Sequence, residues 1–328
     1  MITRDLVIVG GGPAGMAAAV AAQEAGVKDI LLLERDQHLG GILNQCIHTG
    51  FGLHHFKKDL TGPEYADQFI KKIAEINQGL GTKGLGIIEI SLKSFVVNLT
   101  KDKVLTYLKP GKFEEIKAKA LIMATGCRER TREMTHIAGT RPAGIYPAGL
   151  AQKMINIEGL LPGKEIVIIG SGDIGLIMAR RFTLEGAKVK AVIEIQEKTR
   201  GLARNVVQCL EDFSLPLYFR HRIAKIYGKD RVEKVLIENT VNGETFELTC
   251  DTVLISVGLI PENELIEMAC VEIDRKTNSP VSKEVNKCSV KGIFVCGNSY
   301  KVYDLVDNVT RDSVKAGQMA AAYLKGLK

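Results

Sequence analysis

The sequence contains one glycine-rich turn pattern twice, and each copy lies between an apolar strand and a helix. Residues 10–15 have the pattern G-x-G-x-x-G after the apolar run 6–9, and residues 170–175 repeat it after the run 165–169. In such a unit the first glycine makes the turn, the second lets backbone amides reach a pyrophosphate, and the third allows close packing of helix on strand. The repeated pattern predicts two dinucleotide-binding units of the Rossmann type in one chain.

Each copy is followed by a second strand that ends in a glutamate. Glu34 and Glu194 both lie nineteen residues after the third glycine of their copy. A carboxylate at that position accepts hydrogen bonds from the ribose hydroxyls of a dinucleotide, and the alternative for each is a solvated carboxylate at a strand end. Two dinucleotides in one chain favour a flavin paired with a nicotinamide, between which a hydride passes.

Length and charge narrow the class of protein. A chain of 328 residues exceeds the usual size of one domain, so two cores are expected. Charges of both signs are well mixed and the net charge is only +6, which argues against a nucleic-acid-binding surface. Residues 6–23 carry no charge, but a Gly-Gly-Gly-Pro run at 10–13 interrupts them, so a strand, a turn and a helix are expected rather than a membrane span.

The seven cysteines are scattered through the chain without any C-x-x-C pair. No ligand set has zinc spacing, so no metal site is predicted. This use of cysteine fits a reducing compartment, and the start of the chain lacks a basic leader followed by an apolar segment and a cleavage site. We therefore expect a cytoplasmic protein.

Three further segments carry a resemblance to a known family. Residues 124–126 are Ala-Thr-Gly after an apolar strand, residues 251–261 run from Asp-Thr-Val to Gly-Leu-Ile-Pro, and residues 292–298 are Gly-Ile-Phe-Val-Cys-Gly-Asn. With the two glycine patterns, they resemble the pyridine nucleotide-disulfide oxidoreductase superfamily, most closely its two-domain, thioredoxin-reductase-like branch. The resemblance implies an α/β chain of two Rossmann-like, three-layer ββα domains. An NAD(P)-binding domain (127–250) would be inserted into an FAD-binding domain made from residues 1–126 and 251–328.

The resemblance also implies the cofactor ligands. For FAD they are Gly10, Gly12, Pro13, Ala14, Gly15, Glu34, Arg35, Gly41, Thr125, Gly126, Gly297, Asn298, Val309 and Thr310. For NAD they are Gly170, Gly172, Asp173, Ile174, Gly175, Glu194 and Gly258. A C-terminal helix over about 308–324 would point its N-terminus at the flavin, with Asp304 or Asp307 as its cap. The apolar segments between Gly86 and Leu108 would form a small antiparallel insertion.

Three departures from the family pattern bear on function. Thioredoxin reductases carry a C-x-x-C before the second glycine pattern, whereas residues 147–150 here are Pro-Ala-Gly-Leu, which excludes dithiol exchange at that place. Asn298 stands at the position where the family has an aspartate that binds the ribityl chain, so a charge-assisted hydrogen bond becomes a neutral one. Glu194 is followed by Ile-Gln at 195–196 instead of a basic pair, so NAD(H) is expected to be preferred over NADP(H), with Arg200 as an available phosphate contact.

The segment 40–56 holds Cys46, His48, His54 and His55. Cys46 and His48 are the two candidate catalytic residues, as a proton donor, a charge-transfer thiolate or a contact for a partner. The structural alternative is a loop with a buried cysteine and merely polar histidines. A Cys/His metal site in this segment matches no known ligand spacing.

Residues 40–46 and 143–149 are also similar to FAD/NAD-binding subunits associated with multi-subunit dehydrogenases for glycerol 3-phosphate, amines or opines. The leading hypothesis is therefore an FAD-dependent NAD(P)H oxidoreductase that serves as the electron-transfer subunit of a multi-subunit dehydrogenase. Its partner would be a separate dehydrogenase or electron-carrier polypeptide. One alternative is a freestanding reductase of ferredoxin or a quinone. The other is a nucleotide-binding regulatory protein without catalysis, and formation of a homodimer stays open.

Overall fold

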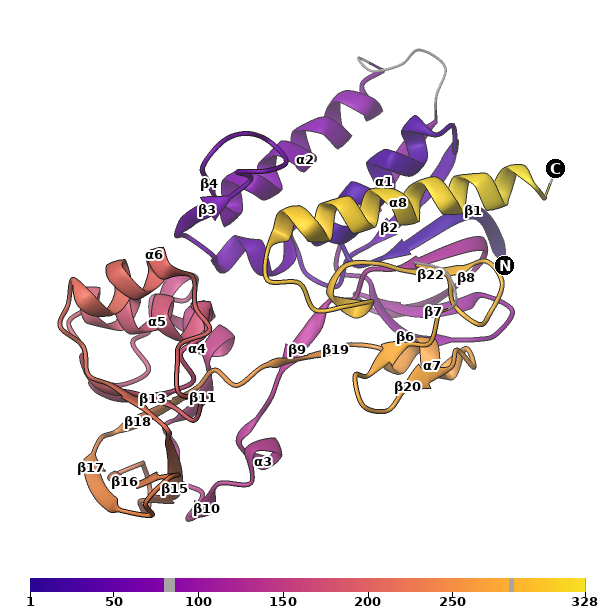
Figure 1. Ribbon diagram of the computed structural model, residues 1–328. Helices are drawn as coiled ribbons and strands as arrows, with labels where there is room; N and C mark the ends of the chain where they lie inside the picture. The colour runs from indigo at the N-terminus through magenta and orange to yellow at the C-terminus, as the bar shows by residue number, and fades with distance from the viewer. Residues whose placement is uncertain (80–85, 283–285, 328) are drawn as a thin grey trace. The chain divides into compact units, whose positions relative to one another are not determined.

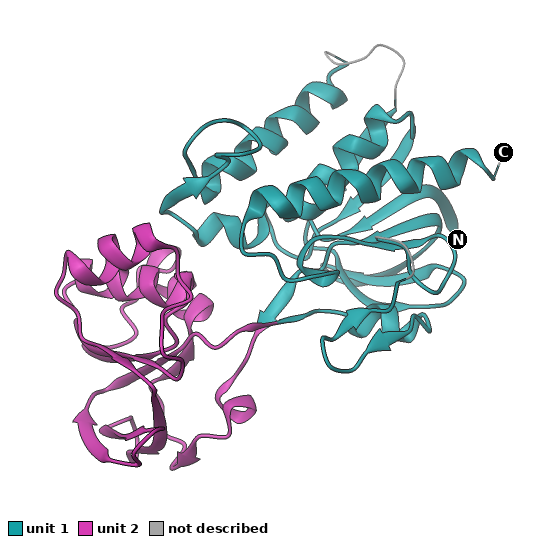
Figure 2. Ribbon diagram, viewed as in Figure 1, with its two compact units in different colours: residues 1–128, 260–328 teal, residues 129–259 magenta. Residues whose placement is uncertain are grey.

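The structure is a computed structural model that describes residues 1–79, 86–282 and 286–327. It divides into two compact units, which Figure 2 shows in different colours. The first unit consists of Met1–Arg128 and Ile260–Lys328, and the inserted unit is Glu129–Leu259. The chain leaves the first unit through β9 (Cys127–Glu129) and returns through β19 (Leu259–Pro261).

A seven-stranded sheet forms the middle layer of the first unit (Figure 1). Six of its strands follow one another in the order β5 (Ile87–Ser91), β2 (Asp29–Leu33), β1 (Ile2–Val9), β8 (Lys112–Met123), β7 (Val104–Lys109) and β6 (Phe95–Leu99). The seventh strand, β22 (Ile293–Val295), pairs with β8. The pairs among β5, β2, β1, β8 and β22 are parallel, whereas β6 with β7 and β7 with β8 are antiparallel.

The strand β5 corrects one expectation. The antiparallel insertion predicted between Gly86 and Leu108 is present for β6 and β7, but it is wrong for β5, which pairs in parallel with β2. The physical reason is the helix α2 (Gly62–Asn77), which separates β2 from β5. A strand, a crossover helix and a second strand return the chain to the same sheet edge in parallel.

Side chains of β1 alternate between the two faces of this sheet. Leu6 and Ile8 are fully buried in the core formed with the helices, whereas Val7 and Val9 belong to a second core on the opposite face. That second core also contains residues of β6, β7 and α7 (Glu264–Met268). The helices of the first face are α1 (Pro13–Glu24), α2 and α8 (Val306–Lys325), as Figure 1 shows.

The helix α2 begins with a capping box. The backbone N–H of Glu64 donates to the Thr61 hydroxyl at 3.4 Å, and the Glu64 carboxylate accepts the backbone N–H of Thr61 at 2.8 Å. These two bonds satisfy backbone donors that a helix start otherwise leaves open.

Thr61→Ala should lower the free energy of unfolding by about 1 kcal/mol, because the helix loses its side-chain cap. Urea titration followed by circular dichroism measures the change. Thr61→Ser, which keeps the hydroxyl, is the matched control and should lose much less. Equal losses in the two variants would contradict a role for the cap.

The inserted unit also has three layers. Its central sheet is fully parallel, in the order β11 (Ile145–Pro147), β18 (Thr252–Ile255), β12 (Glu165–Ile169), β13 (Lys188–Glu194) and β14 (Leu217–Phe219). One face packs against α4 (Ala148–Asn156) and α5 (Asp173–Leu184). The other packs against a smaller sheet of β10 (Ala138–Gly139), β15 (His221–Tyr227), β16 (Lys234–Asn239) and β17 (Thr245–Thr249).

The remaining elements are short. They are the 3₁₀ helices Gly41–Gln45 and Gly297–Ser299, α3 (Arg132–Thr135), α6 (Ala203–Val206) with the π-helical turn Val207–Glu211, and the strand pairs β3 (Thr49–Phe51) with β4 (Leu60–Thr61) and β20 (Ile273–Asp274) with β21 (Ser279–Pro280). Over the described ranges, no helix is long and apolar enough to cross a bilayer.

Candidate functional site

The first glycine turn joins β1 to α1 and requires glycine at both ends. Gly10 has φ +107°, and a Cβ there would collide with the carbonyl oxygen of Ala124. A Cβ at Gly15 would collide with the carbonyl oxygen of Gly10, so the helix packs directly on the turn. At Gly12, in contrast, the only atom near a Cβ would be the Cα of Gly41 at 3.9 Å. The middle of the turn is therefore open to a ligand, as a pyrophosphate site requires.

The second turn repeats this construction between β12 and α5. Gly170 has φ +95°, and a Cβ there would collide with the carbonyl oxygen of Ser256. A Cβ at Gly175 would collide with the carbonyl oxygen of Gly170, whereas a Cβ at Gly172 would have no atom within 4 Å. The two turns are therefore equivalent cradles, each at the N-terminus of a twelve-residue helix.

Glu34 ends β2 and is bound to the first turn. Its Oε2 accepts the backbone N–H of Gly11 at 2.6 Å, and its Oε1 accepts that of Asp36 at 2.8 Å. An ionised carboxylate has about four acceptor positions, so roughly two remain for hydroxyl groups of a ligand. The neighbouring Arg35 is exposed.

Glu194 has the same arrangement in the inserted unit. Its Oε2 accepts the backbone N–H of Ser171 at 2.9 Å and the hydroxyl of Ser171 at 2.7 Å, and its Oε1 accepts the backbone N–H of Gln196 at 2.8 Å. Burial acts to raise the pKa of Glu194, but these hydrogen bonds and the charge of Arg200 outweigh it, so the pKa is lowered. Ser171 is absent from the predicted ligands, although its position between the first two glycines could have indicated it.

Several predicted FAD ligands that are far apart in sequence meet around Gly297. A Cβ at Gly297 would lie 2.7 Å from the Cβ of Ala14 in α1 and 3.2 Å from Cγ1 of Val309 in α8. The first turns of α1 and α8 are therefore neighbours, and both direct the positive end of a helix to this region. Thr310, also in the first turns of α8, is fully buried and its hydroxyl lies 2.6 Å from the hydroxyl of Tyr65.

Asn298 is held by the loop that precedes α8. Its Oδ1 accepts the backbone N–H of Tyr303 at 3.0 Å, and its Nδ2 contacts Sγ of Cys127 at 3.6 Å. Gly297 itself donates its backbone N–H to the buried carboxylate of Asp312 at 2.8 Å. Asp312 is a site residue that sequence reasoning missed, because an aspartate inside an amphipathic helix gives no signal of its own.

The start of α8 corrects a second expectation. Leu305 occupies the cap position without a side-chain hydrogen bond, so the prediction that Asp304 or Asp307 caps the helix is wrong. Asp307 lies inside the first turn and is 5% exposed. Its carboxylate accepts the backbone N–H groups of His54 and His55 at 3.4 and 3.2 Å, which ties the histidine-containing segment to α8.

Cys46 is buried against the start of α2. Its Sγ contacts the carbonyl oxygen of Ile42 at 3.3 Å, and burial raises the pKa of the thiol to about 12. The thiol therefore stays protonated at neutral pH. His48 contacts the carbonyl oxygen of Thr49 at 3.0 Å and lies beside the ring of Phe51, with centroids 5.0 Å apart. In the described parts of the chain, no three His, Cys, Asp or Glu side chains are placed to hold a metal.

Thiol labelling of the native protein should modify Cys270 before Cys46, because Cys270 is exposed and Cys46 is buried and protonated. Mass spectrometry after a short exposure to a disulfide reagent identifies the labelled peptide. Cys270→Ser should remove the fastest reaction, whereas Cys46→Ser should keep it. Early labelling of Cys46 would contradict this burial.

The stretch Pro-Ala-Gly-Leu at 147–150 forms the start of α4. Both oxygens of Glu129 bind there, one to the backbone N–H of Gly149 at 2.6 Å and the other to that of Leu150 at 3.2 Å. Burial outweighs these hydrogen bonds and raises the pKa of Glu129. Residues 147–150 thus form a helix start whose amides bind a carboxylate, and Glu129 too is absent from the predicted residues.

The two predicted glycines at the connections between the units have positive φ angles, which glycine adopts without strain. Gly126 and Gly258 have φ +76° and +107°, values that side-chain-bearing residues rarely adopt. The Thr125 hydroxyl donates to the carbonyl oxygen of Glu262 at 2.6 Å, which fixes the end of β8 within the first unit.

Two predicted NAD ligands occupy the first turn of α5. The carboxylate of Asp173 accepts the backbone N–H of Leu202 at 2.8 Å and the side-chain N–H of Asn205 at 2.7 Å. Ile174 is 37% exposed. Asp173 therefore holds the loop after β13 against the glycine turn.

The comparisons with known proteins agree with this architecture. A family model described as pyridine nucleotide-disulphide oxidoreductase matches residues 4–318. The thioredoxin reductase of Mycolicibacterium smegmatis is 24% identical over 321 residues, which cover 97% of this chain and 94% of that protein. An opine oxidase subunit of Agrobacterium tumefaciens is 24% identical over 323 residues, which cover 90% of this chain but only 61% of that protein.

A solved thioredoxin reductase of Lactococcus lactis matches with a TM-score of 0.77 at 22% identity, over 98% of this chain and 99% of that one. This likeness confirms the predicted α/β fold with two Rossmann-like domains.

Proposed function

This chain belongs to the pyridine nucleotide-disulphide oxidoreductase family and is an FAD-dependent pyridine nucleotide oxidoreductase, and from that premise we propose that it is the electron-transfer subunit of a multi-subunit dehydrogenase. In this proposal the first unit binds FAD and the inserted unit binds NAD(H). The observation that carries it is the pair of equivalent glycine cradles together with the absence of sulfur at 147–150.

The residues of the first unit fit FAD. The open turn at Gly12 would take the pyrophosphate, and Glu34 would accept ribose hydroxyls with its remaining acceptor positions. Gly297 and Asn298 would face the ribityl chain, and the first turn of α8 would favour negative charge near Val309. Bound FAD supplies the chemistry, which is the acceptance of a hydride from the nicotinamide.

The residues of the inserted unit fit NAD(H) better than NADP(H). Glu194 is ionised and held in place by Ser171 and Gln196, so its charge remains next to the open turn at Gly172. A carboxylate there accepts bonds from two free hydroxyls but repels a 2′-phosphate. We therefore propose NADH as the physiological nicotinamide.

Two observations support the role within a larger dehydrogenase: the absence of cysteine at residues 147–150 and the similarity to an opine oxidase subunit. Electrons that enter the flavin need an acceptor, and the dithiol of thioredoxin reductases is replaced by a helix start that Glu129 holds. The similarity to an opine oxidase subunit supports a second polypeptide as the partner. The cysteines are scattered along the sequence without any C-x-x-C pair, which supports a reducing compartment such as the cytoplasm.

Anaerobic titration of the FAD-loaded protein tests the proposal. NADH should bleach the flavin absorbance band, and NADPH should do so only at much higher concentration. If neither nucleotide bleaches the flavin, the proposed hydride transfer is wrong.

A freestanding reductase is the second candidate, because the chain spans 94% of the length of the M. smegmatis thioredoxin reductase. Screening of acceptors separates the two functions. Rapid turnover of NADH with ferredoxin or a quinone, without any further polypeptide, would favour the freestanding enzyme.

A further inference from the structure

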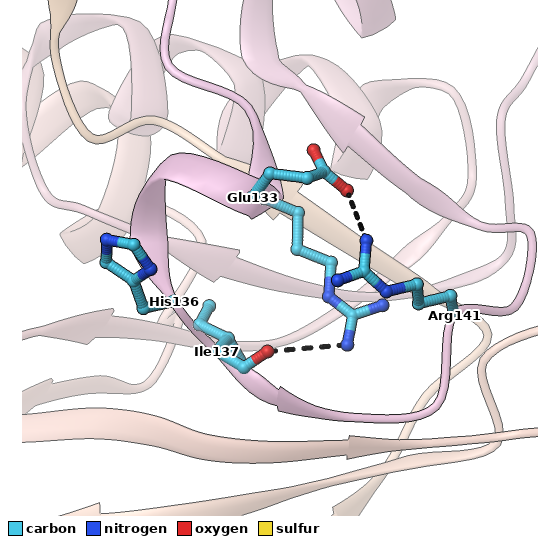
Figure 3. A pocket seen from close by; sticks show the side chains of 5 residues that line it. Glu133, His136, Ile137 and Arg141 are labelled. Carbon is cyan, nitrogen blue, oxygen red and sulfur yellow. Dashed lines mark hydrogen bonds and ion pairs between the residues drawn. The ribbon is translucent and has the colours of Figure 1, made fainter.

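A pocket of about 220 Å³ lies in the inserted unit, outside the glycine cradle (Figure 3). It is lined by Arg132, Glu133, His136, Ile137 and Arg141, which come from α3 and from the loops on either side of β10. None of these residues is a predicted cofactor ligand, so the nucleotide sites leave this group without a role.

Arg132 is a buried cation whose charge has few hydrogen-bond partners and no ion-pair partner among the described residues. The residue is only 8% exposed, and its guanidinium makes two long hydrogen bonds, both from Nη2, to the carbonyl oxygens of Ile137 at 3.4 Å and Ala138 at 3.5 Å. A guanidinium has five N–H donors. Within the described ranges, no carboxylate lies within ion-pair distance of Arg132, and a buried charge without a partner is costly.

A second guanidinium lines the same pocket. Arg141 is exposed and forms one ion pair with Glu133, at 3.3 Å, which Figure 3 shows as a dashed line. Burial and the charge of Arg141 together lower the pKa of Arg132, and Glu133 only partly opposes them. The pocket therefore holds more positive than negative charge, and one of its two guanidinium groups belongs to a buried residue.

We propose that this pocket binds the phosphate group of a small anion through Arg132 and Arg141. Arginine pairs with phosphate oxygens through two parallel N–H donors, and a dianion compensates two guanidinium groups where a single carboxylate compensates one. Glu133 has an exposed side chain and can turn away to water when the anion takes its place on Arg141. The ligand is inorganic phosphate or a phosphate monoester.

Binding is measured by calorimetry and by the melting temperature of the protein saturated with FAD and NAD⁺, so that the two cradles are occupied. The probes are inorganic phosphate and glycerol 3-phosphate at constant ionic strength, with acetate as the carboxylate. Both phosphates, or one of them, should raise the melting temperature by linkage, and the better one identifies the source. Acetate should have no effect.

Arg141→Gln is the decisive variant, because its side chain is exposed and the fold should tolerate the change. It should weaken phosphate binding at least tenfold, and Arg132→Gln should abolish it. Arg222→Gln, which removes an exposed arginine of β15 that is paired with Glu238 of β16, is the matched control and should bind as the wild type does. The site is refuted if phosphate fails to bind, if Arg141→Gln binds unchanged, or if acetate binds equally well.

Discussion

Gly10→Ala is expected to give a protein without bound flavin, whereas Gly26→Ala is expected to stay yellow. Both glycines have a positive φ, +107° at Gly10 and +97° at Gly26, so both substitutions strain the backbone by a similar amount, about 1–2 kcal/mol. They differ in what a Cβ meets. At Gly10 it would collide with the backbone carbonyl of Ala124, whereas at Gly26 no atom lies within 4 Å.

The collision at Gly10 cannot be relieved by a side-chain rotation, because both groups are backbone. Either β1 and β8 separate at their ends or the turn changes shape, and each outcome misplaces the backbone N–H groups of Gly11, Gly12, Ala14 and Gly15. The ratio of absorbance at 450 nm to that at 280 nm, measured after purification of both variants with added FAD, gives the comparison. Full flavin content in Gly10→Ala, or equal loss in the two variants, would refute the assignment of this turn to FAD.

The sequence predicts most reliably those parts of the site that are set by local backbone geometry. The turns at 10–15 and 170–175 need glycine for steric reasons that depend on a few neighbouring residues, so their pattern alone indicates them. Glu34 and Glu194 follow at a fixed distance, because a helix and a strand of fixed length separate them from the turn.

Residues whose partners come from distant segments were not predictable in this way. Asp312 binds Gly297 because α8 packs along α1, and Glu129 binds the start of α4 because β9 ends beside it. Asp307 has the residue type of a cap and lies close to the helix start, yet its carboxylate binds the amides of the loop at 54–55, which the packing of α2 and α8 brings to it. Tertiary contacts decide these cases, and no local pattern records them.

The same limit applies to β5. Its alternating apolar residues fit an antiparallel hairpin as well as a parallel edge strand, because the period of a strand does not depend on its direction. Its buried residue Ile88 belongs to the core beneath α1 and α2, and that packing selects the parallel pairing with β2.

Glu194→Gln is expected to lower the preference for NADH over NADPH by at least about tenfold, measured as the ratio of the two kcat/KM values. The amide cannot accept charge-assisted bonds from the ribose hydroxyls, a loss of about 1.5–3 kcal/mol for NADH. For NADPH the removal of a charge that repels the 2′-phosphate offsets part of this loss. Because the pKa of Glu194 is lowered, the wild-type preference should hold throughout the neutral range and weaken only as acid protonates the carboxylate.

Glu34→Gln is the matched control, since Glu34 makes the equivalent bonds in the first unit. It should weaken FAD binding and leave the NADH to NADPH ratio unchanged when the assay contains excess FAD. If Glu34→Gln shifts the nucleotide ratio and Glu194→Gln does not, the assignment of the two cradles is reversed. If neither variant shifts it, the ribose hydroxyls are bound elsewhere, and Arg200 with the loop at 196–202 becomes the place that determines nucleotide choice.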